Sequence, residues 1–173
     1  WLQHVADEPA GANVPDYRIA TGIVRKYMPG ITIFDASADR GIPGATDIWC
    51  PHVNYFQAHI DFYRRRQALG EKLWFYVCTE PGGRWVNRLL DQELIRPTLI
   101  GWGAALFGAD GFLHWGLNSW LKDQDPFRQL IYTTLGSWPN SLPAGDTHCV
   151  YPGSSGPWSS LRLEAQREGV EDW

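Results

Sequence analysis

The sequence contains no apolar run approaching the roughly 20 residues that a membrane-spanning helix needs. It also lacks a basic excess: the net charge of its 173 residues is −4, which favours neither nucleic acid nor an anionic membrane as a partner. The three cysteines, Cys50, Cys78 and Cys149, lie far apart, without the paired spacing of a zinc site. We therefore expect no transmembrane segment, no nucleic-acid partner, no metal, and cysteines that are buried free thiols.

Two further absences concern the chain start and the cofactor class. The first residue is Trp1 rather than methionine, so we expect residues upstream of it in the working protein. The first apolar segment is followed by "DEPAG" and not by the glycine-rich phosphate loop that usually follows the first strand of a dinucleotide-binding sheet. We expect no cofactor.

Aromatic residues are abundant: ten Trp, seven Tyr and seven Phe. Large flat rings fill cores and also stack on the apolar faces of sugar rings. Apolar and β-branched stretches alternate with segments of helical periodicity along the chain. Strands are expected at 1–6, 31–36, 47–53, 72–78 and 111–118, and helices at 15–30, 54–70, 92–108 and 159–173. A loop-like region rich in Pro, Gly, Ser and Asp separates the last strand from the last helix.

This alternation predicts an α/β fold of parallel β/α units. Polar and aromatic side chains gather where the expected strands end, the edge at which a (β/α)₈ TIM barrel keeps its chemistry. A complete barrel takes about 250 residues, so we interpret 1–173 as one domain holding about the last five units, from the fourth strand onward. Because exposed parallel edges invite aberrant pairing, we expect N-terminal residues or a second chain to complete the fold.

Two adjacent acids, Asp7 and Glu8, follow the first expected strand. Neighbouring strand residues point to opposite faces, so both acids can face one pocket only if the chain leaves the strand there; Pro9 and Gly11 favour that exit. One acid held protonated beside one held ionised is the arrangement that cleaves glycosidic bonds. The alternative is that either acid caps the helix that follows.

Five segments together resemble the catalytic domain of glycoside hydrolase family 123. They are "HVADEP" (4–9), "WFYVCTEP" (74–81), "GADGFLHWGLNSW" (108–120), "DTHCVYPG" (146–153) and "SSLRLEAQREGVEDW" (159–173). The resemblance implies a β-N-acetylgalactosaminidase-like enzyme with a (β/α)₈ barrel and a glycan substrate. It also implies a bacterial protein that is secreted or periplasmic rather than cytoplasmic.

The resemblance further implies a retaining, substrate-assisted mechanism through an oxazolinium intermediate. Glu8 would protonate the leaving oxygen and later deprotonate water, while Asp7 would accept a hydrogen bond from the acetamido N–H of the substrate. This is an exception to the usual pair of carboxylates in retaining enzymes. Two other hypotheses stay open: a glycosidase for another sugar with a conventional carboxylate pair, and a non-catalytic carbohydrate-binding barrel remnant.

Several other residues are candidates for substrate binding, each with a structural alternative. Glu80 is either a second catalytic carboxylate or a partner of loop N–H groups, and His52 with Asn54 binds sugar hydroxyls or is structural. The Tyr76 hydroxyl could reach an acetamido carbonyl. Trp115 and Trp120 around Asn118 form either an aromatic shelf or core, and Tyr151 lies in a loop where core packing is less expected. Core, turn and solvated-face roles are expected for His114, for Asp110 and Asp146 beside glycines, and for "RRR" at 64–66.

Overall fold

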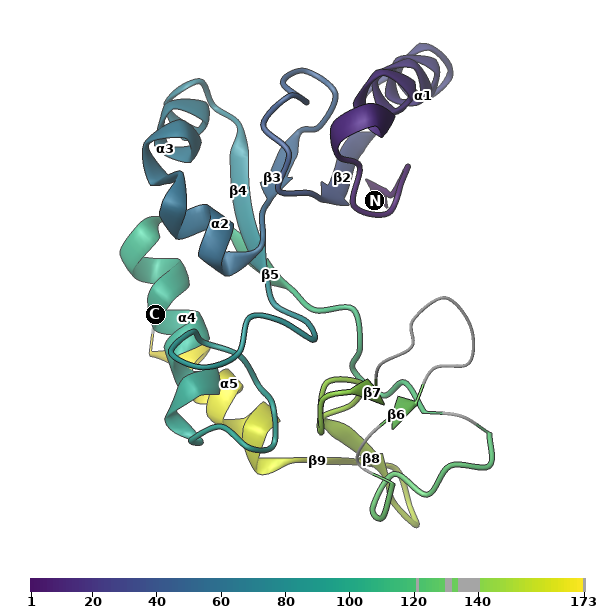
Figure 1. Cartoon of the computed structure of the whole chain (residues 1–173), viewed down its shortest axis with the longest axis vertical. Helices are drawn as coiled ribbons and strands as arrows, with labels where there is room; N and C mark the ends of the chain where they lie inside the picture. Colours follow the sequence, from purple (N-terminus) through teal and green to yellow (C-terminus); the bar gives the residue numbers. More distant parts are fainter. Residues whose placement is uncertain (121, 130–131, 134–140, 173) are drawn as a thin grey trace. The chain divides into compact units, whose positions relative to one another are not determined.

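The computed structural model describes residues 1–120, 122–129, 132–133 and 141–172, and the chain divides into two compact units. The sheet unit comprises Trp1–Tyr76 and Gly108–Leu113, and the second unit comprises Val77–Phe107 and His114–Trp173. The sheet unit contains β1 (Leu2–Gln3), η1 (Gly11–Asn13), α1 (Val14–Tyr27), β2 (Thr32–Ala36), β3 (Ile48–Cys50), α2 (Val53–Ala58), α3 (Ile60–Ala68), β4 (Lys72–Tyr76) and β5 (Gly111–Leu113). The second unit contains α4 (Ile95–Phe107), β6 (Tyr132–Thr133), β7 (Ser141–Leu142), β8 (Val150–Pro152), β9 (Pro157–Ser159) and α5 (Leu161–Glu171) (Figure 1).

The sheet unit is built on five parallel strands in the order β1-β2-β3-β4-β5. Strand order therefore follows chain order, as in successive units of a TIM barrel, and the α/β class with five parallel strands is confirmed. Trp74 on β4 is the register partner of Gly111 on β5. A Cβ on Gly111 would lie 2.4 Å from the Trp74 ring, so only glycine lets the two strands pair at this point. That the chain is one domain starting at the fourth barrel strand stays a prediction.

The core of the sheet unit lies where α2 and α3 pack against β4 (Figure 1). Trp49 from β3 meets Tyr63 from α3 with ring centroids 6.0 Å apart, and Phe56 from α2 stacks on Phe75 from β4 at 6.3 Å. Trp49, Tyr63 and Phe75 are all buried. These rings hold the carboxyl ends of β3 and β4 in fixed positions, because close-packed aromatic cores resist displacement.

Several expected elements of the sheet unit are shorter in the structure; the strands expected at 47–53 and 72–78 are β3 and β4, and two further elements differ for a clear local reason. The strand expected at 1–6 is only β1, because the N–H groups of Val5 and Ala6 bond to the carboxylate of Asp35 instead of to a neighbouring strand. The helix expected at 54–70 is interrupted at His59, whose backbone angles (φ −128°, ψ 30°) leave the helical region before α3 begins. Gly70 ends α3 with a φ of 87°, as its position predicts.

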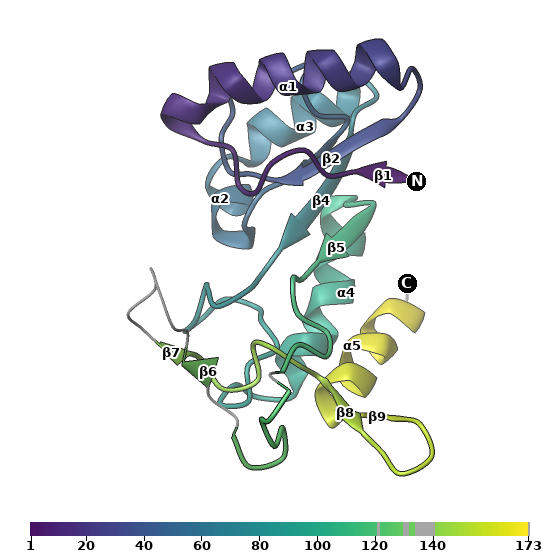
Figure 2. The same ribbon diagram turned by 90° about the vertical axis from the view of Figure 1, so that its right-hand side faces the viewer.

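The second unit is organised around the helix pair α4 and α5, which lie side by side in both views (Figures 1 and 2). The helices cross at two glycines: a Cβ on Gly101 would lie 2.1 Å from the carbonyl oxygen of Gly169. Ser160 caps α5, because its hydroxyl oxygen accepts a hydrogen bond from the N–H of Leu163 at 3.3 Å. The hairpin β8–β9, which precedes α5, lies in the region expected to be loop-like.

The strand expected at 111–118 ends at Leu113, so the prediction of a strand over 114–118 is wrong. His114 Nδ1 accepts a hydrogen bond from the N–H of Gly116 at 3.0 Å, and the guanidinium of Arg88 donates to the carbonyl of Gly116. Side chains therefore hold Gly116, while the backbone of Leu117 and Ser119 bonds to the backbone of 147–150 in the second unit rather than to β4. Within the described part of the chain, no helix is both long and apolar enough to cross a bilayer.

Candidate active site

The segment that carries Asp7 and Glu8 is fixed to the end of β2 by one buried carboxylate. Asp35 is 1% exposed, and its Oδ1 accepts hydrogen bonds from the N–H groups of Val5 at 2.8 Å and Ala6 at 3.1 Å. The ring Nδ1 of His4 lies 2.6 Å from the same oxygen. A buried carboxylate is stable only when it is satisfied in this way, so Asp35 fixes the backbone directly before Asp7.

The second oxygen of Asp35 binds the helix that follows. Tyr17 on α1 donates its hydroxyl hydrogen to Asp35 Oδ2 at 2.8 Å. Burial, and then the adjacent carboxylate, raise the pKa of Tyr17, so its hydroxyl stays protonated and remains a donor. Asp35 thus joins β2, the segment before the acid pair and α1.

Two further side chains after β2 hold the far end of the same loop. Ser37 donates its hydroxyl hydrogen to the carbonyl of Pro9 at 2.7 Å, and Asp39 Oδ2 accepts the N–H of Gly11 at 2.8 Å. Alternate residues of one segment, Asp35, Ser37 and Asp39, therefore fix the chain on both sides of the acid pair. A loop held at both ends keeps its functional groups in place without a ligand.

The acid pair lies where the chain leaves β1 and turns. Glu8 has a φ of 43°, the left-handed conformation that residues other than glycine rarely adopt. Asp7 and Glu8 are both exposed. The Tyr76 hydroxyl, at the end of β4, donates to Glu8 Oε1 at 2.5 Å. The turn thus leaves both acids accessible and directs the Glu8 carboxylate to a fixed partner across the sheet edge.

Tyr76 is itself supported from β3. The ring of His52 lies 4.7 Å from the Tyr76 ring between centroids, and His52 is only 6% exposed. His52 Nδ1 lies 2.8 Å from Asn54 Oδ1, which also accepts the N–H of Tyr55 at 2.9 Å. Because that amide oxygen is an acceptor, Nδ1 of His52 carries hydrogen. Glu8, Tyr76, His52 and Asn54 therefore form one cluster at the carboxyl ends of β1, β4 and β3.

An acid pair at the carboxyl edge of a parallel sheet is an arrangement found in barrel hydrolases. The family profile described as "Glycoside hydrolase 123, catalytic domain" matches residues 2–173, nearly the whole chain. The chain belongs to glycoside hydrolase family 123. It is therefore a glycoside hydrolase by family, which confirms the resemblance. A comparison with curated proteins gives no significant match.

Four of the residues expected to bind substrate in this family 123 chain gather in the second unit, around the segment 146–149. Asn118 forms an antiparallel bridge with His148, and the rings of Trp120 and Tyr151 meet His148 edge-on, with centroids 5.8 Å and 4.9 Å away. Trp115 donates its indole N–H to Asp146 Oδ2 at 3.1 Å. Trp115 and Asn118 are exposed, so their side chains are available to a ligand, and their role in binding stays a prediction.

Asp146 has a larger structural role than the turn predicted for it. It is fully buried, its Oδ2 holds Trp115, and its Oδ1 lies 3.3 Å from Nε2 of His114. Burial lowers the pKa of His114, and Nδ1 accepts from the Gly116 N–H, so the neutral ring carries its hydrogen on Nε2 facing Asp146. The core role predicted for His114 agrees with this burial.

The structure gives Asp110 a defined role and leaves the role of Glu80 open. Asp110 Oδ2 accepts the N–H of Leu73 at 2.9 Å, so Asp110 holds β4 rather than only forming a turn. Glu80 lies in the second unit with an exposed side chain, and its backbone carbonyl accepts the N–H of Cys78 at 2.8 Å. The choice between a catalytic and a structural Glu80 therefore stays open.

Among the described residues, no three His, Cys, Asp or Glu side chains are grouped as metal ligands.

Sequence reasoning gave no role to Asp35 and did not single out Tyr17. The signal was present in "ITIFDA", where one carboxylate lies within a β-branched strand. A charge at such a position is costly unless it is paired, so it indicates a specific partner. Tyr17 lies within the helix expected at 15–30, and the partner of its hydroxyl lies 18 residues away in the sequence.

Replacing Tyr76 by Phe is expected to lower kcat about tenfold with little change in KM. The variant keeps the ring against His52 and removes only the hydrogen bond to Glu8, so the acid loses its fixed orientation. Steady-state kinetics on an aryl β-glycoside would measure the split. Tyr55→Phe, at an exposed ring on α2, is the matched control and should leave both constants within about twofold. An unchanged kcat in Tyr76→Phe would contradict a positioning role.

Proposed function

We propose that the enzyme removes terminal β-linked N-acetylhexosamine, specifically N-acetylgalactosamine, by a retaining, substrate-assisted mechanism. The observation that carries this proposal is the Glu8 carboxylate in the loop that follows β1, which is accessible, held by Tyr76 and adjacent to Asp7. A carboxylic acid in a fixed orientation beside a second carboxylate is what protonation of a glycosidic oxygen requires.

In the first step, the C1–O bond to the leaving group breaks while the carbonyl oxygen of the substrate's 2-acetamido group bonds to C1. Glu8 gives its proton to the departing oxygen and becomes a carboxylate. Since the Tyr76 hydroxyl occupies Oε1, the transferred proton is carried by Oε2. In the second step, Glu8 takes a proton from water as the water oxygen attacks C1 and reopens the ring, which regenerates the acid and the acetamido group.

Asp7 acts on the acetamido group. Its carboxylate accepts a hydrogen bond from the acetamido N–H, which turns the carbonyl oxygen toward C1 and stabilises the positive charge of the oxazolinium ring. The left-handed backbone of Glu8 supports this division, because the chain has left the strand and the two acids need not alternate between sheet faces. An enzyme of this kind needs no nucleophile of its own.

The experiment that tests the proposal is inhibition by the thiazoline analogue of N-acetylgalactosamine, a stable mimic of the oxazolinium ring. We expect competitive inhibition at least about a hundredfold tighter than by N-acetylgalactosamine itself, as for transition-state-like ligands. Asp7→Asn should weaken the thiazoline more than the sugar, with Asp16→Asn on α1 as the control. Trapping of a covalent glycosyl-enzyme, with no thiazoline inhibition, would instead support a glycosidase that uses its own carboxylate nucleophile.

A further inference from the structure

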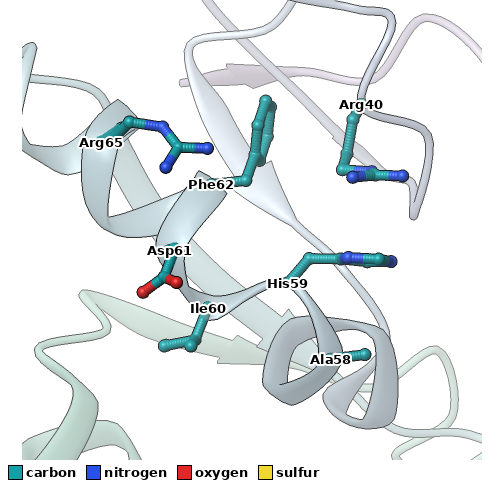
Figure 3. A pocket seen from close by; sticks show the side chains of 7 residues that line it. All are labelled: Arg40, Ala58, His59, Ile60, Asp61, Phe62 and Arg65. Carbon is teal, nitrogen blue, oxygen red and sulfur yellow. The ribbon is translucent and has the colours of Figure 1, made fainter.

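A pocket of about 220 Å³ lies in the sheet unit where α2 and α3 meet (Figure 3). It lies at the interruption between the two helices, where His59 leaves helical geometry and α3 begins at Ile60. We name this feature the α2–α3 pocket, and the side chains that matter in it are Arg40, His59, Asp61, Phe62 and Arg65.

The solvated face predicted for the three consecutive arginines of α3 agrees with Arg64 and Arg65, which are both exposed, whereas Arg66 is half-buried. Arg66 bonds to Glu71 and lies over the Trp49 ring, 5.6 Å from its centroid. Arg64 is exposed and does not line the pocket. Arg65 lines it, and within the part of the chain that the structure describes it has neither an ion pair nor a hydrogen bond. Of these three arginines, Arg65 alone lines the pocket and has a guanidinium without an ion pair or hydrogen bond among the described residues.

A second arginine without an ion pair among the described residues comes from the loop after β2. Arg40 also lacks an ion pair among the described residues, and it directly follows Asp39, whose carboxylate bonds to the N–H groups of Gly11 and Gly41. Its positive charge acts on the buried Tyr63 hydroxyl, opposing the burial that raises the pKa of that group. Arg40 thus lies against α3, with its loop anchored to the loop that carries Glu8.

The directions of the side chains favour an anion. In Figure 3 the Phe62 ring stands between the guanidinium groups of Arg65 and Arg40, and His59 lies on the Arg40 side. The carboxylate of Asp61, the one acidic side chain of the lining, points away from both guanidinium groups. Two arginines that line one pocket, with no carboxylate directed at either, supply charge-assisted donors that an oxyanion can accept.

We propose that the α2–α3 pocket binds a single oxyanion group, a sulfate ester or a carboxylate, carried by the glycan. At about 220 Å³ the pocket is smaller than the roughly 300 Å³ at which cavities begin to enclose a whole drug-sized ligand, so it fits one substituent rather than a sugar chain. The link to the glycan rests on the proposed function, because it assumes that Glu8 acts on the same molecule. The anion binding itself does not depend on that assumption.

The direct test is a titration of the protein with sodium sulfate at constant ionic strength, followed by the NMR signals of the arginine side-chain N–H groups. We expect saturable shifts of the Arg40 and Arg65 signals. The double variant Arg40→Gln/Arg65→Gln should raise the Kd for sulfate at least about tenfold, as expected for lost charge-assisted hydrogen bonds. Arg64→Gln is the matched control and should stay within about twofold. Absence of saturation, or equal losses in Arg64→Gln and the double variant, would overturn the proposal.

Kinetics then connects the pocket to the substrate. The double variant should raise KM for a sulfated β-N-acetylgalactosaminide about tenfold and leave KM for the neutral glycoside unchanged. A parallel titration with glucuronate separates the two sources of the oxyanion: tighter sulfate binding assigns a sulfate ester, and tighter glucuronate binding assigns a carboxylate. If neither glycoside is cleaved, the proposed function fails, while the sulfate titration still decides the pocket. An equal rise in KM for both glycosides would overturn the assignment to a charged substituent.

Discussion

Replacing Glu8 by Gln should lower kcat by more than about a hundredfold on a β-N-acetylgalactosaminide whose leaving group is a sugar or simple alcohol. The variant keeps the size of the side chain and an oxygen that can accept from Tyr76. It removes only the ability to transfer a proton. An alkoxide leaving group that receives no proton is a poor one, so the barrier to breaking the C1–O bond rises.

The loss should depend on the leaving group in a way that a folding defect would not. A dinitrophenolate departs without a proton, so on that glycoside the first step of Glu8→Gln should be nearly as fast as in the unmodified enzyme. The second step still lacks its base and becomes limiting, which predicts a burst of dinitrophenol followed by slow turnover. Stopped-flow absorbance measures both phases.

Glu168→Gln, on an exposed position of α5, is the control and should leave both phases unchanged. Normal turnover of Glu8→Gln on alkyl glycosides would remove Glu8 from the proposed mechanism. An equal loss on alkyl and dinitrophenyl glycosides, without a burst, would also contradict a role in protonating the leaving group.

The parallel sheet could be predicted because its strands are defined by local signals. Segments such as 72–78 are almost wholly apolar, and they are bounded by glycine and proline, so length and composition suffice to place them. The strands at 1–6 and 111–118 were overestimated for a different reason. In both, side chains far away in sequence, Asp35 and Arg88, take backbone groups that a strand would have used. Such competition depends on tertiary contacts and leaves no periodic pattern.

The candidate site also has a part that could be predicted from local sequence and a part that depends on distant contacts. The positions of Asp7 and Glu8 follow from one short segment at the end of β1, and the turn at Glu8 agrees with the proline that follows it. The partner of Glu8 could not be predicted, because Tyr76 lies 68 residues away. The sequence indicated an acetamido contact for that hydroxyl, whereas its bond in the structure is to the acid itself. The resemblance to a family implied roles for the two acids but carried no information about the side chains that hold them in place.

Replacing Arg162 by Ala should lower the free energy of unfolding by about 3–5 kcal/mol. Arg162 is 5% exposed at the start of α5, and its guanidinium donates to three backbone carbonyls, those of Arg88 at 2.5 Å, Gly145 at 2.8 Å and His148 at 2.7 Å. The three carbonyls belong to two segments of the second unit, one around Arg88 and the other at 145–148. One side chain thus joins α5 to segments that carry little regular secondary structure.

The alanine variant leaves three carbonyl oxygens without this donor in a buried space. Each buried polar group that loses its partner costs about 1–3 kcal/mol, and the cavity left by the guanidinium adds to this loss. The fit around the side chain is close: a Cβ on Gly145, whose φ is 85°, would lie 2.6 Å from Nη1 of Arg162. Little rearrangement can therefore fill the space, and the cost should fall at the upper end of the range.

Urea unfolding followed by tryptophan fluorescence would measure the change, and Arg167→Ala supplies the control on the same helix. Arg167 has a side chain 61% exposed that pairs only with Glu164 and Glu171, so its loss should cost less than about 1 kcal/mol. Arg162→Lys tests the geometry separately: it keeps the charge but not the planar fork, and it should recover only part of the loss because one ammonium cannot reach three separated carbonyls. If Arg162→Ala unfolds at the same urea concentration as Arg167→Ala, the loops of the second unit are held by other contacts.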